Sequence, residues 1–138
     1  MVAQVVACAG AIPGYMTSMS DHRHVLLIGL DPHAIPGFDA ALVDTAIAIG
    51  QKRFESLGLS ADLCLVKPDA SADPEILAHL RRKEYACVVI GGGLRKPDDM
   101  VELFERVVNL VRKHAPGAAI AFNTNPTNSA DAAMRWLP

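Results

Sequence analysis

Two side chains that could move a proton stand close together near the start of the chain. Asp31 and His33 directly follow an apolar run, residues 25–30. A carboxylate beside an imidazole can orient and tune a general acid–base group. We therefore predict Asp31 and His33 as a catalytic pair, with His33 as acid or base and Asp31 as its orienting partner. The alternative is that Asp31 hydrogen-bonds the turn and His33 is an ordinary loop residue.

A second set of residues has the chemistry to hold an anion. Three glycines, Gly91, Gly92 and Gly93, precede Arg95 and Lys96, and a helical pattern follows them. Backbone N–H groups at the start of a helix favour phosphate or carboxylate, and two cations there favour a negative neighbour. We predict that these five residues bind an anionic ligand. In the alternative, Asp98 and Asp99 already neutralise the two cations.

A polar segment near the end of the chain supplies further candidates. It runs from Asn123 to Asn128 after the apolar run 118–122. We predict that Asn123 and Asn125, which are nearest the apolar run, hydrogen-bond a ligand, and that Thr127 and Asn128 satisfy local turns. No residue set with the spacing of a metal site or of a nucleophile with its base accompanies them.

The elements that must position these residues follow from four largely apolar runs, residues 25–30, 61–66, 86–90 and 118–122. Such runs are typical of strands buried on both faces, and helical segments without hairpin signals separate them. We predict a single α/β domain over residues 23–138. Its architecture is a three-layer α/β/α sandwich with a four-stranded parallel sheet.

The strand order decides which loops meet. A flavodoxin-like order 2-1-3-4 places the ligand crevice between strands 1 and 3, and a Rossmann-like order 3-2-1-4 places it between strands 1 and 4. We favour 2-1-3-4, because short crossovers favour neighbouring strands. The segment 31–37 borders the crevice in both orders, opposite either 91–96 or 123–129.

The helices carry three further predictions. The helix expected over about residues 38–57 should face the sheet through Leu42, Ala46, Ile49 and Leu57, with Phe54 near this face. Gly50 in its middle indicates close packing against the sheet, and Asp99 with Glu102 fits a capping box. In the order 2-1-3-4, one face of the sheet has only this helix and a short last one, so we predict a homodimer whose partner covers the rest.

Composition and charge limit the class of protein. The chain has 138 residues, of which 51% are hydrophobic, and this suits one domain with an aliphatic core. The net charge of −2 argues against nucleic acid as a partner, and no apolar run reaches the ~18 residues of a membrane span. The three cysteines, Cys8, Cys64 and Cys87, form no CxxC pattern, which fits free thiols in a cytoplasmic protein.

The first 22 residues are predicted to be an extension or arm. Residues 1–12 are apolar but have no Lys or Arg before them, so the positive region of a signal peptide is missing. We expect the functional chain to start near Met16 or Met19.

Asp31 and His33 also allow one comparison. Asp31-x-His33 resembles the D-x-H-x-x-G signature of cobalamin-binding domains, which are flavodoxin-like and whose histidine ligates cobalt. Here Pro36 stands at the position of the signature's glycine, and Gly37 comes one residue late. The resemblance covers only residues 31–37, so the cofactor stays unassigned.

Three functions remain open from the sequence. The first is a protein that binds a phosphorylated or carboxylated metabolite, either without chemistry or as an isomerase, lyase or transferase. The second is a sensor, regulatory or cofactor-binding module that uses the same pocket. The third is an oligomeric scaffold.

Overall fold

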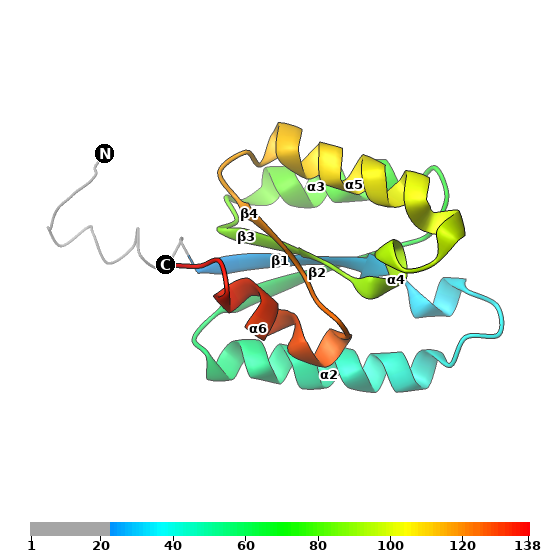
Figure 1. The fold of residues 1–138 in the computed structure, drawn as a ribbon, viewed down its shortest axis with the longest axis horizontal. Coiled ribbons are helices and arrows are strands. Elements are labelled where there is room, and N and C mark those ends of the chain that lie inside the picture. The colour runs from blue at the N-terminus through cyan, green and yellow to red at the C-terminus, as the bar shows by residue number, and fades with distance from the viewer. Residues whose placement is uncertain (1–22) are drawn as a thin grey trace, which may run out of the picture.

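Strands and helices alternate along the part of the chain that the structure, a computed structural model, describes, residues 23–138 (Figure 1). The predicted extension, residues 1–22, lies outside the described residues. The elements are β1 (His24–Leu30), η1 (Pro32–Ala34), α2 (Ala40–Ser56), β2 (Ser60–Val66), α3 (Ala72–Arg82), β3 (Cys87–Ile90), α4 (Gly92–Arg95), η2 (Asp98–Met100), α5 (Val101–His114), β4 (Ala119–Phe122), η3 (Pro126–Asn128) and α6 (Ser129–Met134).

The four strands form one parallel sheet in the order β2-β1-β3-β4. This confirms the flavodoxin-like order and excludes the order 3-2-1-4. The register pairs Ile28 with Cys64 on one side and with Ile90 on the other. All four carboxyl ends therefore point to the same end of the sheet (Figure 1). At this end η1 follows β1, α4 follows β3, and η3 follows β4.

Helices cover both faces of the sheet, as predicted for a three-layer sandwich. α3 and α5 lie on one face, and α2 and α6 lie on the other (Figure 1). This arrangement is the one that right-handed crossovers require for the order 2-1-3-4.

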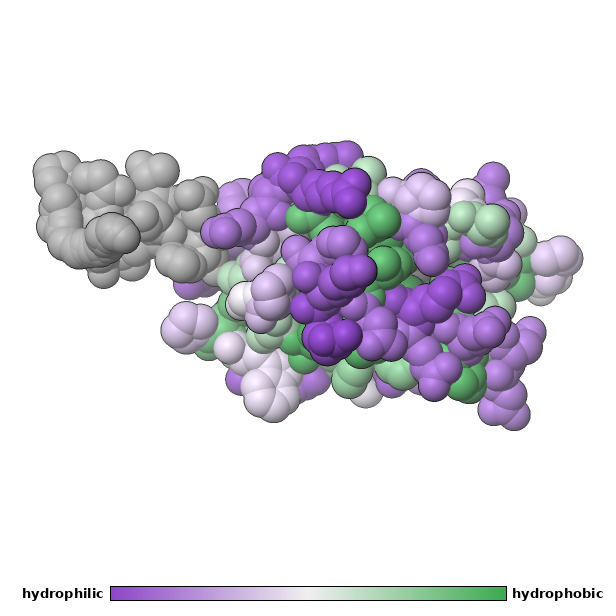
Figure 2. Space-filling model, turned by 90° about the horizontal axis from the view of Figure 1, so that it is seen from above, coloured by the Kyte–Doolittle hydropathy of each residue, from purple (hydrophilic) through white to green (hydrophobic). Residues whose placement is uncertain are grey.

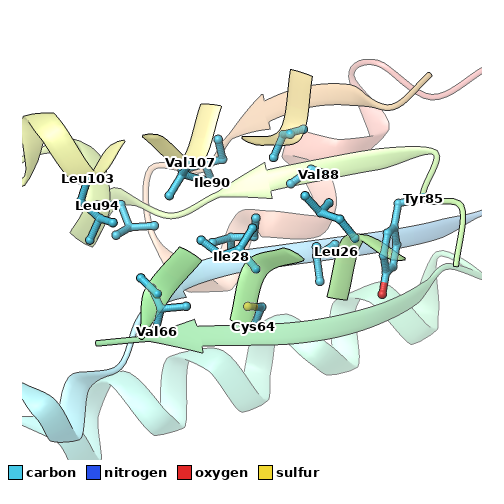
Figure 3. Packing of buried hydrophobic residues seen from close by; sticks show 14 residues of the cluster. Leu26, Ile28, Cys64, Val66, Tyr85, Val88, Ile90, Leu94, Leu103 and Val107 are labelled. Carbon is cyan, nitrogen blue, oxygen red and sulfur yellow. The ribbon is translucent and has the colours of Figure 1, made fainter. Parts of the chain in front are cut away.

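Alternate strand residues supply the two halves of the core, since successive side chains point to opposite faces. Leu26, Ile28 and Val88 pack toward α3 and α5 (Figure 3), and Val25 and Val89 pack toward α2 and α6. All five are fully buried. The apolar runs are therefore continuous because both faces of these strands are covered by helices.

The orientation of α2 corrects one prediction. Leu42 is 68% exposed and Ile49 is 53% exposed, so these two residues lie on the outer face, whereas Ala46 and Leu57 are half-buried. Phe54, predicted near the inner face, is buried as expected, and Val43 and Ile47 turn toward the cavity in place of Leu42 and Ile49. The helix has apolar residues on two sides, and periodicity alone chose the wrong one.

Two local predictions also need correction. α5 begins at Val101 after a 3-10 turn, and no side chain caps it, so Asp99 and Glu102 do not form the predicted capping box. Gly50 approaches not the sheet but the loop after β4, where a Cβ at this position would lie 2.3 Å from the Pro126 carbonyl oxygen. The tight contact was predicted correctly, but its partner was not.

The short helix α6 completes the cover that we had assigned to a partner subunit. Cys87, Val89 and Ala121 on the α2/α6 face are 0–1% exposed within a single chain. The sheet is therefore not bare, and this reason for a homodimer falls away. Among residues 23–138, no helix combines the length and the apolar character that crossing a membrane requires.

Candidate functional site

A cavity of about 570 Å³ opens at the carboxyl ends of β1 and β3. This is the point where the strand order reverses, and ligands of open α/β sheets bind there. Its lining comes from the end of β1 and the loop after it, from α2, and from the segments that follow β3 and β4. The lining residues are Leu27, Gly29, Leu30, Pro32, Ile35, Phe38, Val43, Ile47, Leu65, Gly91, Gly92, Gly93, Lys96, Pro97, Asp99, Met100, Asn123, Thr124, Asn125 and Pro126.

Glycines open the floor of this cavity. Gly91 passes so close to β1 that a Cβ would contact the Gly29 Cα atom at 3.6 Å, and a Cβ on Gly93 would contact the Leu30 side chain at 3.4 Å. Larger residues at Gly29, Gly91 and Gly93 would place side chains in this space. The three glycines line the cavity with backbone and no side chain, and their contact with a ligand stays a prediction.

The walls of the cavity are apolar. α2 contributes Val43 and Ile47, the loop after β1 contributes Ile35 and Phe38, and Met100 lies opposite. Such walls exclude water and favour an apolar part of a ligand. Ile35 lies in the segment 31–37 that was predicted to border the crevice, whereas Phe38, Val43, Ile47 and Met100 were not predicted, because they are apolar and lie outside the segments expected at the crevice. The available signal was the second apolar side of α2.

The predicted anion cradle is only partly free. The Gly91 N–H donates to the Ile28 carbonyl at 2.8 Å, and the Gly92 N–H donates to Asn123 Oδ1 at 3.1 Å. α4 has only four residues, so it provides no long helix end for an anion. The three glycines line the cavity, but two of their amides already have protein acceptors.

Asn123 joins three elements at the edge of the cavity. It is 3% exposed, it accepts from Gly92 through Oδ1, and its Nδ2 donates to Ser129 Oγ at 2.8 Å. The side chain therefore ties the glycine run after β3 to the start of α6. Its predicted contact with a ligand stays a prediction.

Asn125 and Asn128 shape the loop after β4. Asn125 Oδ1 accepts from the Thr127 backbone at 2.9 Å, and Asn128 Oδ1 accepts from the Thr124 backbone at 3.1 Å. Asn128 Oδ1 also accepts from the Asn125 backbone N–H at 3.4 Å, which completes a capping box around η3. Asn125 still lines the cavity, although its carboxamide oxygen is engaged locally.

The two predicted cations differ in position. Lys96 lines the cavity, and its Nζ donates to the Thr124 carbonyl at 2.9 Å. Arg95 lies beside the cavity rather than in its lining. Its guanidinium donates to the Asn123 carbonyl and lies 5.3 Å from the centre of the Phe122 ring. Within residues 23–138, neither cation forms an ion pair with a carboxylate.

Asp31 and His33 lie outside the cavity lining. Asp31 Oδ1 accepts from the His33 backbone N–H at 2.9 Å and caps η1. The His33 ring contacts a different carboxylate, Asp44 on α2, with 2.8 Å between Nε2 and Oδ2. The structure thus brings His33 together with Asp44, and it does not bring His33 and Arg95 to one cavity.

Burial makes the two described cysteines poor nucleophiles. It raises the pKa of the Cys64 thiol to about 12 and that of Cys87 to about 11. Only the thiolate is nucleophilic. Among the described residues, no group of three or more His, Cys, Asp and Glu side chains could hold a metal ion.

A separate charged cluster lies at the other end of the sheet. Tyr85 donates to Asp62 Oδ2 at 2.7 Å, and Lys83 Nζ lies 3.1 Å from the same oxygen. Burial alone would raise the pKa of Asp62, but these two contacts outweigh it and lower that pKa. Burial and the Asp62 contact raise the pKa of Tyr85. This cluster stabilises the fold and is not part of the cavity.

Comparison with protein-family models found no match, and comparison with curated proteins found none either. The function is therefore argued from the cavity alone.

Proposed function

We propose that the protein binds an amphipathic small-molecule anion, with an apolar body and a carboxylate or phosphate head, in the cavity at the carboxyl ends of β1 and β3. One observation carries the proposal: the apolar cavity is lined by the amine of Lys96, which has no carboxylate partner among residues 23–138.

The volume and walls of the cavity support the apolar part of the ligand. About 570 Å³ falls within the range of roughly 300–1,000 Å³ that is typical of small-molecule sites. Ile35, Val43, Ile47 and Met100 offer side chains that gain by contact with an apolar group rather than water. A purely polar metabolite would leave these walls without a matching surface.

The charges at the cavity support an anionic head group. Within residues 23–138, the Lys96 ammonium donates one hydrogen bond, to the Thr124 carbonyl, and its two other hydrogens can bind a ligand. Arg95 adds a second positive charge nearby, and Asp99 is the one carboxylate among the lining residues. A hydrogen bond from an ammonium group to an anionic oxygen is roughly twice as strong as a neutral one.

An enzymatic role has one contact in its favour. The 2.8 Å contact between His33 and Asp44 is the geometry of an oriented general acid–base group. Pro32 and Ile35, on either side of His33, line the cavity. We therefore keep an isomerase, lyase or transferase as the second candidate, with Asp44 instead of Asp31 as the orienting residue.

We also propose that the protein acts in the cytoplasm and as a homodimer. The free thiols of Cys64 and Cys87 support a reducing compartment. The exposed apolar side chains on the outer side of α2 support a dimer.

Isothermal titration calorimetry with three matched probes tests the proposal. Octyl phosphate has both parts of the ligand, octanol has only the apolar part, and inorganic phosphate has only the anion. We expect saturable binding of octyl phosphate at one site per chain, with at least about tenfold weaker binding of each partial probe. Equal affinity for octanol and octyl phosphate would show that the anionic head group contributes nothing to binding, and would contradict the proposal.

Two variants show where the probe binds. Lys96→Met keeps the apolar stem but removes the charge, and should weaken octyl phosphate binding roughly tenfold to hundredfold, the loss of one charged hydrogen bond. The matched control is Lys113→Met on α5, which removes the same charge away from the cavity and should leave binding unchanged. Equal losses in both variants would mean that only overall charge matters.

A further inference from the structure

The outer side of α2 exposes a stripe of apolar and small residues. Leu42 is 68% exposed and Ile49 is 53% exposed. Ala41, Thr45 and Ala48 lie between and beside them and are also exposed. These five residues, which we call the α2 stripe, follow one another at spacings that keep them on a single face of the helix.

The opposite outer layer has a different character. The side formed by α3 and α5 is mostly hydrophilic (Figure 2), and Glu102, Glu105 and Arg112 are exposed on α5. α5 therefore follows the usual pattern of a helix with one face in water. α2 does not, and neighbouring exposed apolar side chains on a helix mark an interaction surface.

We propose that the α2 stripe binds the α2 stripe of a second copy of this chain, in an antiparallel pair across a two-fold axis at Thr45. Positions 41, 45, 48 and 52 alternate spacings of four and three, which is the seam that two packed helices share. In a two-fold pair, residues equally far before and after Thr45 face each other. Leu42 then meets the partner's Ala48, and Ile49 meets the partner's Ala41, so each large side chain has a small one opposite.

The charges along α2 specify the antiparallel direction and a second copy. Asp39 and Asp44 lie at the start of the helix, and Lys52, Arg53 and Glu55 lie near its end. Asp44 already contacts His33 and Arg53 already contacts Asp131, which leaves Asp39 and Lys52 for a contact between two copies. Antiparallel pairing places Lys52 beside the partner's Asp39, whereas parallel pairing would place like charges together. Within the described residues Lys52 forms no ion pair, and it would share the Asp39 carboxylate with the Leu42 N–H that Asp39 Oδ1 caps at 3.2 Å. The antiparallel helix dipoles add to the same preference.

The polar residue at the centre of the stripe is compatible with burial. Thr45 Oγ1 donates to the Ala41 carbonyl at 3.0 Å within the same helix. Its hydroxyl donor therefore needs no water, and an interface would not leave it without a partner. The dimer would also fix the outer side of the helix whose inner side forms a cavity wall through Val43 and Ile47.

Sedimentation velocity on the full chain tests the interface. We expect a dimer for the natural sequence, and a monomer for the double variant Leu42→Glu with Ile49→Glu. Each change acts twice in a two-fold pair, so the dissociation constant should rise by at least about a hundredfold. The matched control is Val101→Glu, at a 49% exposed apolar position on α5, which should leave the dimer intact. A monomeric natural chain at about 100 µM, or a double variant that stays dimeric, would overturn the proposal.

A cross-link tests the register and does not depend on a disruptive variant. In a Cys8→Ser background, Thr45→Cys places a thiol on the two-fold axis, while Cys64 and Cys87 stay buried. We expect mild oxidation to give a covalent dimer with Thr45→Cys and none with Glu105→Cys on the outer side of α5. Equal cross-linking of both variants, or none of Thr45→Cys, would contradict the antiparallel pair centred on Thr45.

Discussion

Replacing Gly50 by alanine changes stability in two opposite ways: it improves helix propensity, and it introduces a steric contact with Pro126. The structure indicates that the steric contact is the larger effect. In the interior of a helix, alanine is more favourable than glycine by about 1 kcal/mol. At this position, however, the new Cβ would lie 2.3 Å from the Pro126 carbonyl oxygen and 3.3 Å from the carbonyl carbon. The helix and the loop after β4 would have to separate by roughly 1 Å to restore an ordinary contact.

The cost of that separation sets the expected stability. Overpacking costs about 1–3 kcal/mol, and a contact with backbone rather than a flexible side chain belongs to the upper part of this range. Subtracting the gain in helix propensity leaves Gly50→Ala destabilised by roughly 1–2 kcal/mol. The midpoint of thermal unfolding should fall by roughly 4–10 °C.

Urea unfolding followed by circular dichroism measures this difference. The slope of the free energy against urea should stay unchanged, so that the shift in midpoint reports stability. The control is Gly117→Ala, where a Cβ meets no atom within 4 Å and the change should be near neutral. A stabilised Gly50→Ala would show that propensity prevails and that α2 does not approach the Pro126 loop as closely as described.

Three further predictions concern single side chains. Asn123→Ala removes the acceptor of the half-buried Gly92 N–H and the donor to Ser129 Oγ, and should cost about 1–3 kcal/mol in the free energy of unfolding. No loss would mean that water replaces the Asn123 amide. The pKa of Asp62 is lowered in the folded state, so its carboxylate stabilises the fold at neutral pH, and this stabilisation is lost as the pH falls below about 4. Asp62→Asn should therefore have a lower free energy of unfolding than the natural chain at pH 7, and the difference should narrow in acid. A difference that does not change with pH would contradict the contact with Tyr85. His33→Ala should cost no more than about 0.5 kcal/mol, because its side chain is 64% exposed, and should abolish any turnover; a large loss of stability would remove His33 from the catalytic candidates.

The sheet was predictable because each strand is buried on both faces. Continuous apolar residues such as Val88, Val89 and Ile90 leave no room for a solvent-facing side, and this requires helices above and below. Short connections then favour neighbouring strands, which gave the correct order. The ends of several helices were not predictable, because the packing of the chain decides whether Asp99 caps α5 or lies in a 3-10 turn before it.

The sequence predicted which strand ends border the cavity, but it did not predict that the cavity walls are apolar. Gly91, Lys96 and Asn123 were identified because they follow strand ends, and they do line the cavity. Its apolar walls were missed because they depend on which side of α2 turns inward. Leu42 and Val43 are adjacent and both apolar, so the sequence pattern could not decide between them. The rotation of α2 follows from tertiary contacts, among them the close approach of Gly50 to Pro126 and the burial of Phe54.

The central claim is that the cavity beyond β1 and β3 binds an amphipathic anion, and a titration of ¹⁵N-labelled protein with octyl phosphate tests it most directly. We predict saturable shifts of the backbone amide signals of Gly91, Gly93, Lys96 and Thr124, with the signals of α3 and of the outer side of α5 unchanged. Lys96→Met should reduce these shifts at the same concentration of probe. Shifts that cluster away from the cavity, or shifts that are the same in Lys96→Met, would contradict the account.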